Sequence, residues 1–221
     1  MNHATTNPAG PDNRTPLHIE ASEHEVRSRP GDAVTFRGDV LVVPGLVPAD
    51  LCARAIELAE GDGGWQKSRT VREANQAQTA GASARQSDSL FITGRPGFSE
   101  VDEALHRCFM TAHATLEARS GQELMLMRDE GHTLMRYRPG GFYRLHHDYM
   151  GCARPPIVRA LTGLIFLNHD FAGGRLRFPR QDLEITPSCG SVVLFPSIWT
   201  HPHCATEVTF GDRYCVVTWW A

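Results

Sequence analysis

The pattern of apolar and polar positions divides the chain into a polar start and a folded remainder. Residues 1–32 contain few large apolar side chains and many Pro, Asn, Thr, Arg and Glu residues, a composition that predicts a flexible N-terminal tail. An apolar run over 34–43 then predicts a first strand, which ends at Pro44-Gly45. We therefore expect a single domain over residues 33–221.

Two helices are predicted in the first half of this domain. Apolar residues recur at helical spacing over 51–59, and glycines follow them. A second helical pattern covers 101–116 and ends at Gly121. Ser99 and Asp102 precede it at the spacing of a capping box. The sequence thus predicts two helices ahead of the C-terminal part.

A long polar segment at about 65–90 lies between the two helices and shows no helical or strand periodicity. Connections of this length are often lids over functional sites. From Glu123 onward, short apolar or alternating runs are separated by Gly, Pro, Asn and Asp, which is typical of a β-sandwich or barrel. The candidate strands are 123–127, 132–138, 143–148, 160–167, 175–178, 183–186, 190–195, 201–209 and 213–219.

The charge and composition of the chain exclude several classes of partner. The formal net charge is −3, which gives no electrostatic basis for binding nucleic acid or an anionic membrane. No apolar run approaches the roughly 20 residues of a membrane span, and the N-terminus lacks the apolar core of a secretory signal. We therefore expect a cytoplasmic protein whose six cysteines are free thiols.

The candidate chemistry is concentrated in the string HHD at residues 146–148. Side chains two positions apart point the same way in a strand, so His146 and Asp148 would project together. Two such residues supply two of the three ligands of a facial triad, which holds Fe(II) and leaves positions open for a co-substrate and O2. The pattern alone is weak, because His146 could equally be a hydrogen-bonded histidine at a strand end.

Further residues recur at fixed spacings around this pair. They are Tyr137, Gly140, Tyr143, His146 and Asp148, then Arg159, Thr162, Leu167 and Asn168, then Gly173, Gly174, Leu176 and Phe178, then Pro187 and Gly190, and finally His203, Val208, Gly211 and Arg213. This ordered set resembles the prolyl 4-hydroxylase branch of the Fe(II)/2-oxoglutarate-dependent dioxygenases, and the resemblance covers roughly residues 36–221.

The resemblance implies an α+β, mainly β fold: a double-stranded β-helix, or jelly-roll, barrel buttressed by N-terminal helices. It also implies Fe(II), 2-oxoglutarate and O2 as cofactors, with ascorbate as a candidate reductant. The implied reaction is hydroxylation of an unactivated C–H bond with release of succinate and CO2. Halogenating relatives carry a small residue in place of the acid, so Asp148 favours hydroxylation.

The third metal ligand has two candidates, because His201 and His203 share the same parity along a predicted strand. Strand alternation cannot separate them. The family places its histidine ten residues before a basic residue, and that spacing from Arg213 selects His203. His201 remains the alternative.

Arg213 is predicted to bind the distal carboxylate of 2-oxoglutarate, because a guanidinium stays charged and can pair with a carboxylate bidentately. By the resemblance, Tyr137 donates its hydroxyl to the same co-substrate; it could also be an ordinary tyrosine of the barrel wall. The chain departs from the family at Phe166, where relatives often carry a tyrosine that donates to the distal carboxylate.

The substrate is predicted to be a small molecule, either an amino acid or a biosynthetic intermediate. Arg159 and Trp199 are the candidate substrate-binding residues, and Thr162 and Trp219 are candidate pocket residues. For Arg159, a salt bridge at the barrel rim is the alternative. Alternative functions are a peptidyl, prolyl-type protein hydroxylase and, from a different class, a non-redox metal-binding barrel or scaffold.

Overall fold

The computed structural model describes residues 25–27, 31–68, 84–126, 128–149 and 158–221. Most of the predicted tail, the middle of the polar segment at 65–90 and Cys152 lie outside these ranges. In the described part, strands predominate and two helices precede the C-terminal strands. The mainly β, jelly-roll-like fold with N-terminal helices is therefore confirmed, although the strands form separate sheets and not one closed barrel.

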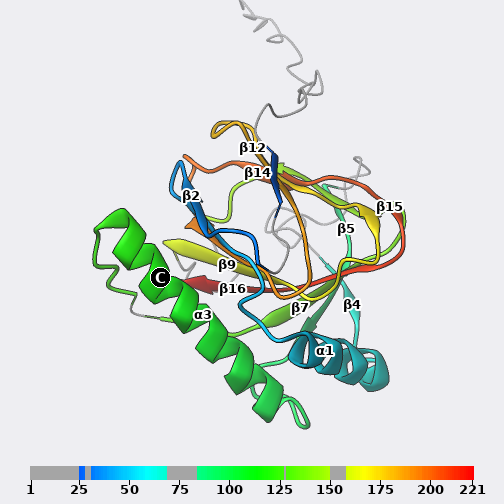
Figure 1. The fold of residues 1–221 in the computed structure, drawn as a ribbon. Helices are drawn as coiled ribbons and strands as arrows, with labels where there is room; N and C mark the ends of the chain where they lie inside the picture. Colours follow the sequence, from blue (N-terminus) through cyan, green and yellow to red (C-terminus); the bar gives the residue numbers. More distant parts are fainter. Residues whose placement is uncertain (1–24, 28–30, 69–83, 127, 150–157) are drawn as a thin grey trace, which may run out of the picture.

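Two sheets make up most of the molecule (Figure 1). The six-stranded sheet has, in spatial order, β1 (Glu25–Arg27), β12 (Leu183–Thr186), β11 (Leu176–Phe178), β14 (His203–Ala205), β8 (Phe142–His146) and β5 (Arg85–Gln86). The eight-stranded sheet has β2 (Thr35–Arg37), β3 (Val40–Val43), β13 (Val192–Pro196), β9 (Leu161–Phe166), β16 (Arg213–Trp220), β7 (Thr133–Tyr137), β6 (Asp88–Phe91) and β4 (Gln66–Lys67). A two-stranded ribbon pairs β10 (Ala172–Gly173) with β15 (Val208–Phe210).

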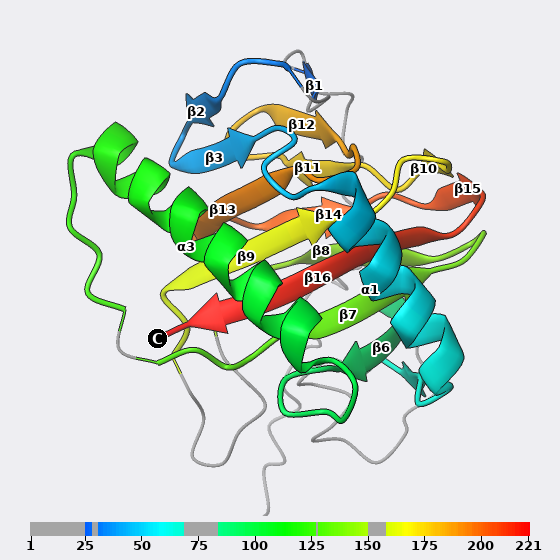
Figure 2. The same cartoon turned by 60° about the horizontal axis from the view of Figure 1, so that its bottom comes forward.

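The helices α1 (Ala49–Asp62) and α3 (Ser99–Ser120) lie across the outer face of the eight-stranded sheet (Figure 2). Their apolar sides form one core with that sheet, in which Leu105 and Phe109 of α3 join Leu194 and Val216. A second core lies among the inward-facing side chains of the two sheets. The molecule is thus built in three layers, and a pocket opens beside the second core.

Both helices end at glycines, as predicted, but the predicted capping box at the start of α3 does not form. Gly63 and Gly121 are the C-caps of α1 and α3, both in the left-handed conformation that glycine adopts without strain. The N-cap of α3 is Phe98, without a side-chain cap. The Asp102 carboxylate instead accepts a hydrogen bond from Thr93 Oγ1 at 2.8 Å, so that prediction is wrong.

Most predicted strands are present, but several differ from the prediction. The single strand predicted over 34–43 divides into the antiparallel pair β2 and β3. No strand forms within 123–126. The predicted strand 201–209 divides into β14 and β15 because Thr206 between them turns to β11: its hydroxyl accepts the backbone N–H of Arg175 at 2.8 Å. The strand predicted over 143–148 ends at His146. Among the strands that were not predicted, β1 pairs in parallel with β12, and β4, β5 and β6 form at the two ends of the polar segment 65–90.

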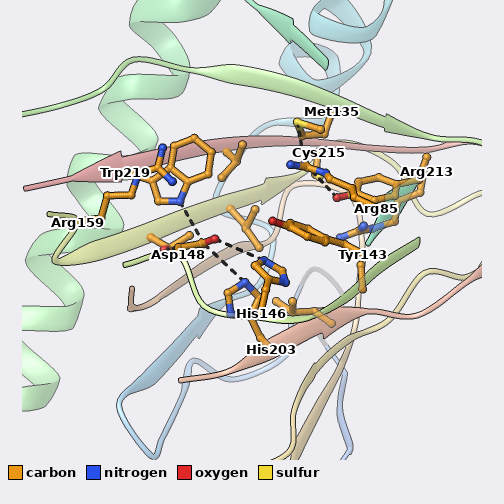
Figure 3. A pocket seen from close by; sticks show the side chains of 16 residues that line it. Arg85, Met135, Tyr143, His146, Asp148, Arg159, His203, Arg213, Cys215 and Trp219 are labelled. Carbon is orange, nitrogen blue, oxygen red and sulfur yellow. Dashed lines mark hydrogen bonds and ion pairs between the residues drawn. The ribbon is translucent and has the colours of Figure 1, made fainter. Parts of the chain in front are cut away.

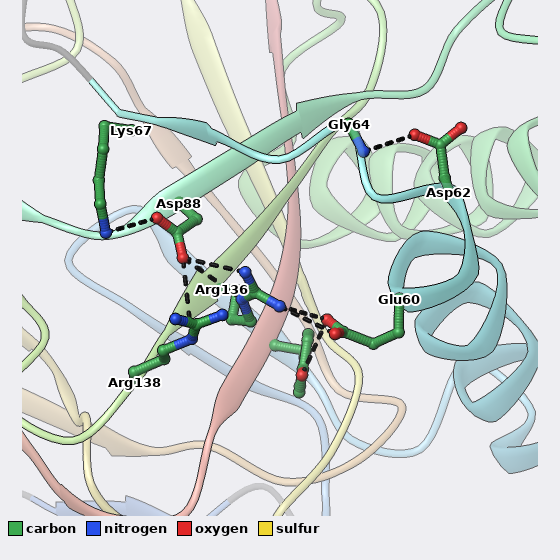
Figure 4. Close-up of polar contacts among 8 residues, drawn as sticks. Glu60, Asp62, Gly64, Lys67, Asp88, Arg136 and Arg138 are labelled. Atoms are coloured by element: carbon green, nitrogen blue, oxygen red, sulfur yellow. Dashed lines mark hydrogen bonds and ion pairs between the residues drawn. The ribbon is translucent and has the colours of Figure 1, made fainter.

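A polar network joins α1 to the strands beside it (Figure 4). The buried Arg136 on β7 donates to both carboxylate oxygens of Glu60 at 2.8 and 2.9 Å and to Asp88 Oδ2 at 3.1 Å. Tyr214 also donates to Glu60, at 3.0 Å, and Lys67 pairs with Asp88 at 2.8 Å.

Within the described residues, neither helix has the length and hydropathy of a membrane span.

Candidate metal and co-substrate site

Three potential metal ligands meet where β8 ends and β14 begins in the six-stranded sheet. His146 ends β8, Asp148 follows it, and His203 begins β14 directly opposite His146 in the strand pairing. One ligand atom from each lies within 4.8 Å of the others. The Nε2 atoms of His146 and His203 lie 3.4 and 3.6 Å from the two oxygens of Asp148. Such a group of two imidazoles and one carboxylate can hold a divalent transition metal.

Backbone carbonyl groups orient both imidazole rings. His146 Nδ1 lies 2.8 Å from the carbonyl oxygen of Arg144, and His203 Nδ1 lies 3.0 Å from that of His201. Because a carbonyl only accepts, each Nδ1 carries a proton, and in the neutral ring Nε2 then has the lone pair that can bind a metal. Metal-binding histidines are commonly fixed in this way.

The carboxylate of Asp148 is buried and accepts two side-chain hydrogen bonds. Its Oδ2 accepts hydrogen bonds from Trp219 Nε1 at 3.1 Å and from Thr162 Oγ1 at 3.0 Å. Burial alone would raise the pKa of Asp148, but His203 and His146 hold it well below its usual range. Burial, with a contribution from His146, lowers the pKa of His203 to about 4. The unprotonated forms that bind metals are therefore favoured at neutral pH.

His201, the alternative ligand, faces away from this group. Its Nε2 lies 2.8 Å from the carbonyl oxygen of Gly38, and its Nδ1 lies 2.8 Å from Thr200 Oγ1. Both ring nitrogens thus have partners, one of them in the turn between β2 and β3. Of the two histidines only His203 lines the pocket.

The pocket has a volume of about 210 Å³ and contains a buried cation on the far side from the triad (Figure 3). Arg213 is 2% exposed, and its guanidinium lies 4.7 Å from the ring centre of Tyr137 and 5.0 Å from that of Phe166. Its Nε and Nη1 are buried without a hydrogen-bond partner among the described residues. A buried, incompletely paired charge is costly, so this wall is suited to the carboxylate of a bound acid.

Arg85 lines the pocket although it was not among the predicted site residues. It lies on β5, where the polar segment returns to the fold, and its guanidinium is 4.4 Å above the Tyr143 ring. Its Nη2 donates to the Tyr137 hydroxyl at 3.4 Å. Tyr143, in turn, stacks on the His146 ring with centroids 3.4 Å apart. The only signal in the sequence was an arginine in a segment expected to act as a lid.

Of the other four predicted site residues, three line the pocket and one does not. Arg159, Thr162 and Trp219 line the pocket. Arg159 donates to both oxygens of Glu130 at 2.7 and 2.8 Å and lies 3.6 Å above the Trp219 ring, as in the alternative that we gave for it. Trp199 is 63% exposed and is not part of the pocket lining.

Comparison with known families assigns the part of the chain that carries these residues. Residues 132–221 match the model of the 2OG-Fe(II) oxygenase superfamily. Prolyl 3-hydroxylase 3 of Mus musculus is 36% identical over 87 residues, which are 35% of this chain and 12% of that protein. Prolyl 3-hydroxylase 1 of Homo sapiens is 31% identical over 83 residues, 34% and 11% respectively. The matches therefore span only about an eighth of the length of these relatives.

Solved structures give the same fold at lower identity. A prolyl hydroxylase from Trichoplax adhaerens, in complex with a hypoxia inducible factor peptide fragment, superposes with a TM-score of 0.65 at 19% identity, covering 82% of this chain and 83% of that one. A Pseudomonas putida prolyl-4-hydroxylase gives a TM-score of 0.62 at 22% identity over 82% and 91%. The viral collagen prolyl hydroxylase of Paramecium Bursaria Chlorella virus-1 gives 0.60 at 19% over 82% and 95%.

These comparisons correct the predicted partner. The relatives carry the names of prolyl hydroxylases, and one solved structure holds a peptide, which points away from a small-molecule substrate. They confirm the predicted resemblance: residues 132–221 match the model of the 2OG-Fe(II) oxygenase superfamily, and prolyl hydroxylases are among the proteins to which the chain is similar in sequence and fold.

Proposed function

We propose that this protein hydroxylates a prolyl-type residue of a peptide or protein, consuming 2-oxoglutarate and O2 at Fe(II) and releasing succinate and CO2. The observation that carries the co-substrate assignment is the buried Arg213, whose Nε and Nη1 lack a partner among the described residues. A non-redox metal-binding barrel or scaffold has no use for such a cation in its pocket. The peptide assignment is supported by the names of the relatives.

His146, Asp148 and His203 would hold the iron, since their ligand atoms already lie within 4.8 Å of one another. Bound iron supplies the activation of O2 that no side chain can provide. The carbonyls of Arg144 and His201 keep each Nε2 free for the metal. Thr162 and Trp219 both donate to Oδ2 of Asp148, which leaves Oδ1 as the less encumbered oxygen.

Arg213 would bind the distal carboxylate of 2-oxoglutarate at the opposite wall. The family's usual tyrosine donor is replaced by Phe166, whose ring packs against the guanidinium and offers no hydrogen bond. We infer that the Tyr137 hydroxyl takes over this donor role, because it accepts a hydrogen bond from Arg85 Nη2 at 3.4 Å and its own proton can then point to the co-substrate. Arg85 thereby acts as a positioning residue for Tyr137.

The polypeptide substrate would enter beside Arg159 and Trp219. These two side chains are held by Glu130 and by each other, so the wall they form is rigid. We further propose that residues 33–221 act as one catalytic domain and that the protein works in the reducing cytoplasm. The described cysteines are free thiols, which such a compartment maintains; ascorbate is a fitting assay reductant.

The first test needs no substrate. Adding 2-oxoglutarate to the anaerobic Fe(II) protein should produce the visible charge-transfer band of bidentate keto-acid chelation. His203→Ala should abolish the band. Arg213→Ala should weaken 2-oxoglutarate binding by roughly 100-fold or more, because leaving a buried charge pair incomplete costs about 3–5 kcal/mol.

His201→Ala is the matched control, because it removes a buried histidine two residues away whose nitrogens face Gly38 and Thr200. It should keep the band. No band in the parent protein with iron bound would overturn the co-substrate assignment.

The second test separates substrates. Succinate release should rise when proline-containing peptides are added and not when the same peptides carry alanine in place of proline. If the protein shows the charge-transfer band but neither set of peptides raises succinate release, the peptide assignment is refuted and the co-substrate assignment stands.

A further inference from the structure

A second group of potential metal ligands lies on the other side of the eight-stranded sheet, between α3 and the segment that follows it. His106 comes from α3, and Asp129 and His132 come from the connection to β7. One ligand atom from each lies within 4.8 Å of the others. They line a separate cavity of about 350 Å³ and share no residue with the first pocket.

His132 is oriented as a ligand and lacks a partner for one nitrogen. The residue is 3% exposed, and its Nδ1 lies 2.7 Å from Asp102 Oδ1. Its Nε2 is buried and has no hydrogen-bond partner among the described residues. Phe109 stacks on the ring at 5.4 Å between centroids and so fixes its plane. A carboxylate bonded to one ring nitrogen, with the other nitrogen left without a protein partner, is the arrangement by which proteins present histidine to a metal.

Asp129 is held in a similar way. Its Oδ1 accepts the backbone N–H of Gly131 and the hydroxyl of Thr218, both at 2.8 Å. Its Oδ2 therefore remains free of these bonds and lies 3.3 Å from His106 Nδ1. The His106 side chain is 46% exposed and can adjust its rotamer to a ligand, whereas the other two are fixed by their surroundings.

We propose that His106, Asp129 and His132 bind a divalent transition metal of the Zn²⁺ class, with water completing the coordination. Two imidazoles and one carboxylate suit Zn²⁺ and not Ca²⁺ or Mg²⁺, which prefer oxygen ligands. The unpartnered Nε2 of His132 would then have its partner. The metal would tie α3 to the segment that carries Glu130, the residue that holds Arg159 at the first pocket.

The test measures Zn²⁺ binding by equilibrium dialysis and metal analysis on residues 1–221, freed of metal by a chelator. The double variant His146→Ala/His203→Ala removes the first site, so any remaining equivalent belongs elsewhere. We expect one equivalent to remain. Adding His106→Ala should abolish it, and this exposed position should not disturb folding, which circular dichroism checks.

Two further variants sharpen the test. In the same background, His169→Ala removes an exposed histidine from the loop before β10 and should leave Zn²⁺ binding unchanged. Asp102→Ala should weaken it by about 10- to 100-fold, as for residues that orient a metal-binding histidine. Failure of the double variant to bind Zn²⁺, or binding that persists after His106→Ala, would overturn the second site without touching the proposed hydroxylase.

Discussion

At the scale of single residues, hydrogen bonds decide what the side chains near the pocket can do. Strand parity left His201 and His203 equivalent, and the family spacing to Arg213 selected His203. The structure adds a physical reason: His201 bonds to Gly38, 163 positions earlier in the chain. The sequence indicated His146 and Asp148 as a pair through strand alternation, but that reason is incomplete. Asp148 lies beyond the end of β8 and is held by its backbone N–H bond to Ser197, not by strand alternation.

Thr162 offers a prediction at this scale. Replacing it by valine keeps its shape but removes one of the two donors to Asp148 Oδ2. We expect Fe(II) affinity to fall by about 10- to 100-fold, measured by anaerobic iron titration. Ser197→Ala is the matched control: it removes the other partner of the Thr162 hydroxyl, at 2.8 Å, and should change iron affinity little. Equal iron affinities in parent and Thr162→Val would contradict this role.

At the scale of elements, the type of most helices and strands and the C-terminal ends of both helices could be predicted, whereas the start of α3 and the ends of several strands could not. The apolar periods of α1 and α3 and their terminal glycines are local signals. The failures depend on distant partners. Asp102 leaves its capping position for Thr93 and His132, and β1 exists through parallel pairing with β12, far along the chain.

The network around Arg136 predicts a pH dependence of stability. Burial would raise the pKa of Asp88, but hydrogen bonds from Lys67 and Arg136 hold it below the ordinary value of 3.8. A carboxyl with a lowered pKa stabilises the fold fully above its unfolded pKa, and this contribution is lost as pH falls through the folded pKa. Asp88→Asn should therefore lose about 1.5–3 kcal/mol of stability at pH 7, and its difference from the parent should shrink below about pH 4.

Urea unfolding at several pH values measures this difference. Glu57→Gln is a suitable control, because this α1 residue forms an exposed pair with Arg54 and should shift stability by no more than about 0.5 kcal/mol at any pH. A gap between Asp88→Asn and the parent that stays constant into acid would contradict the predicted linkage.

At the scale of the whole molecule, the layers explain where the site lies. One core joins the helices to the eight-stranded sheet, and the other lies between the sheets and leaves room for the pocket. Composition and strand pattern indicated a β-sandwich or barrel, and the family resemblance supplied the jelly roll. Neither could place Arg85 in the pocket or Trp199 outside it, because both positions depend on how the loops between strands turn.

The contact between helix and sheet gives a prediction for this scale. Gly163 on β9 lies under α3, and a Cβ at this position would come within 2.8 Å of ring carbons of Phe109 and Trp220. Gly163→Ala should force α3 outward and cost about 1–3 kcal/mol of unfolding free energy, measured by urea denaturation. Gly61→Ala on α1, where a Cβ would meet nothing within 4 Å, is the control and should not destabilise. A neutral Gly163→Ala would show that this contact tolerates a methyl group.

The hydrogen bond from Trp219 to Asp148 has an optical consequence. An indole whose N–H is bound to the carboxylate of the proposed iron site feels directly any change of charge or ligation there. The fluorescence of Trp219 should therefore change when iron binds. A Trp219→Phe variant separates its emission from that of the other three tryptophans. The side chain that orients the acid is also the one through which the state of the site can be followed by light.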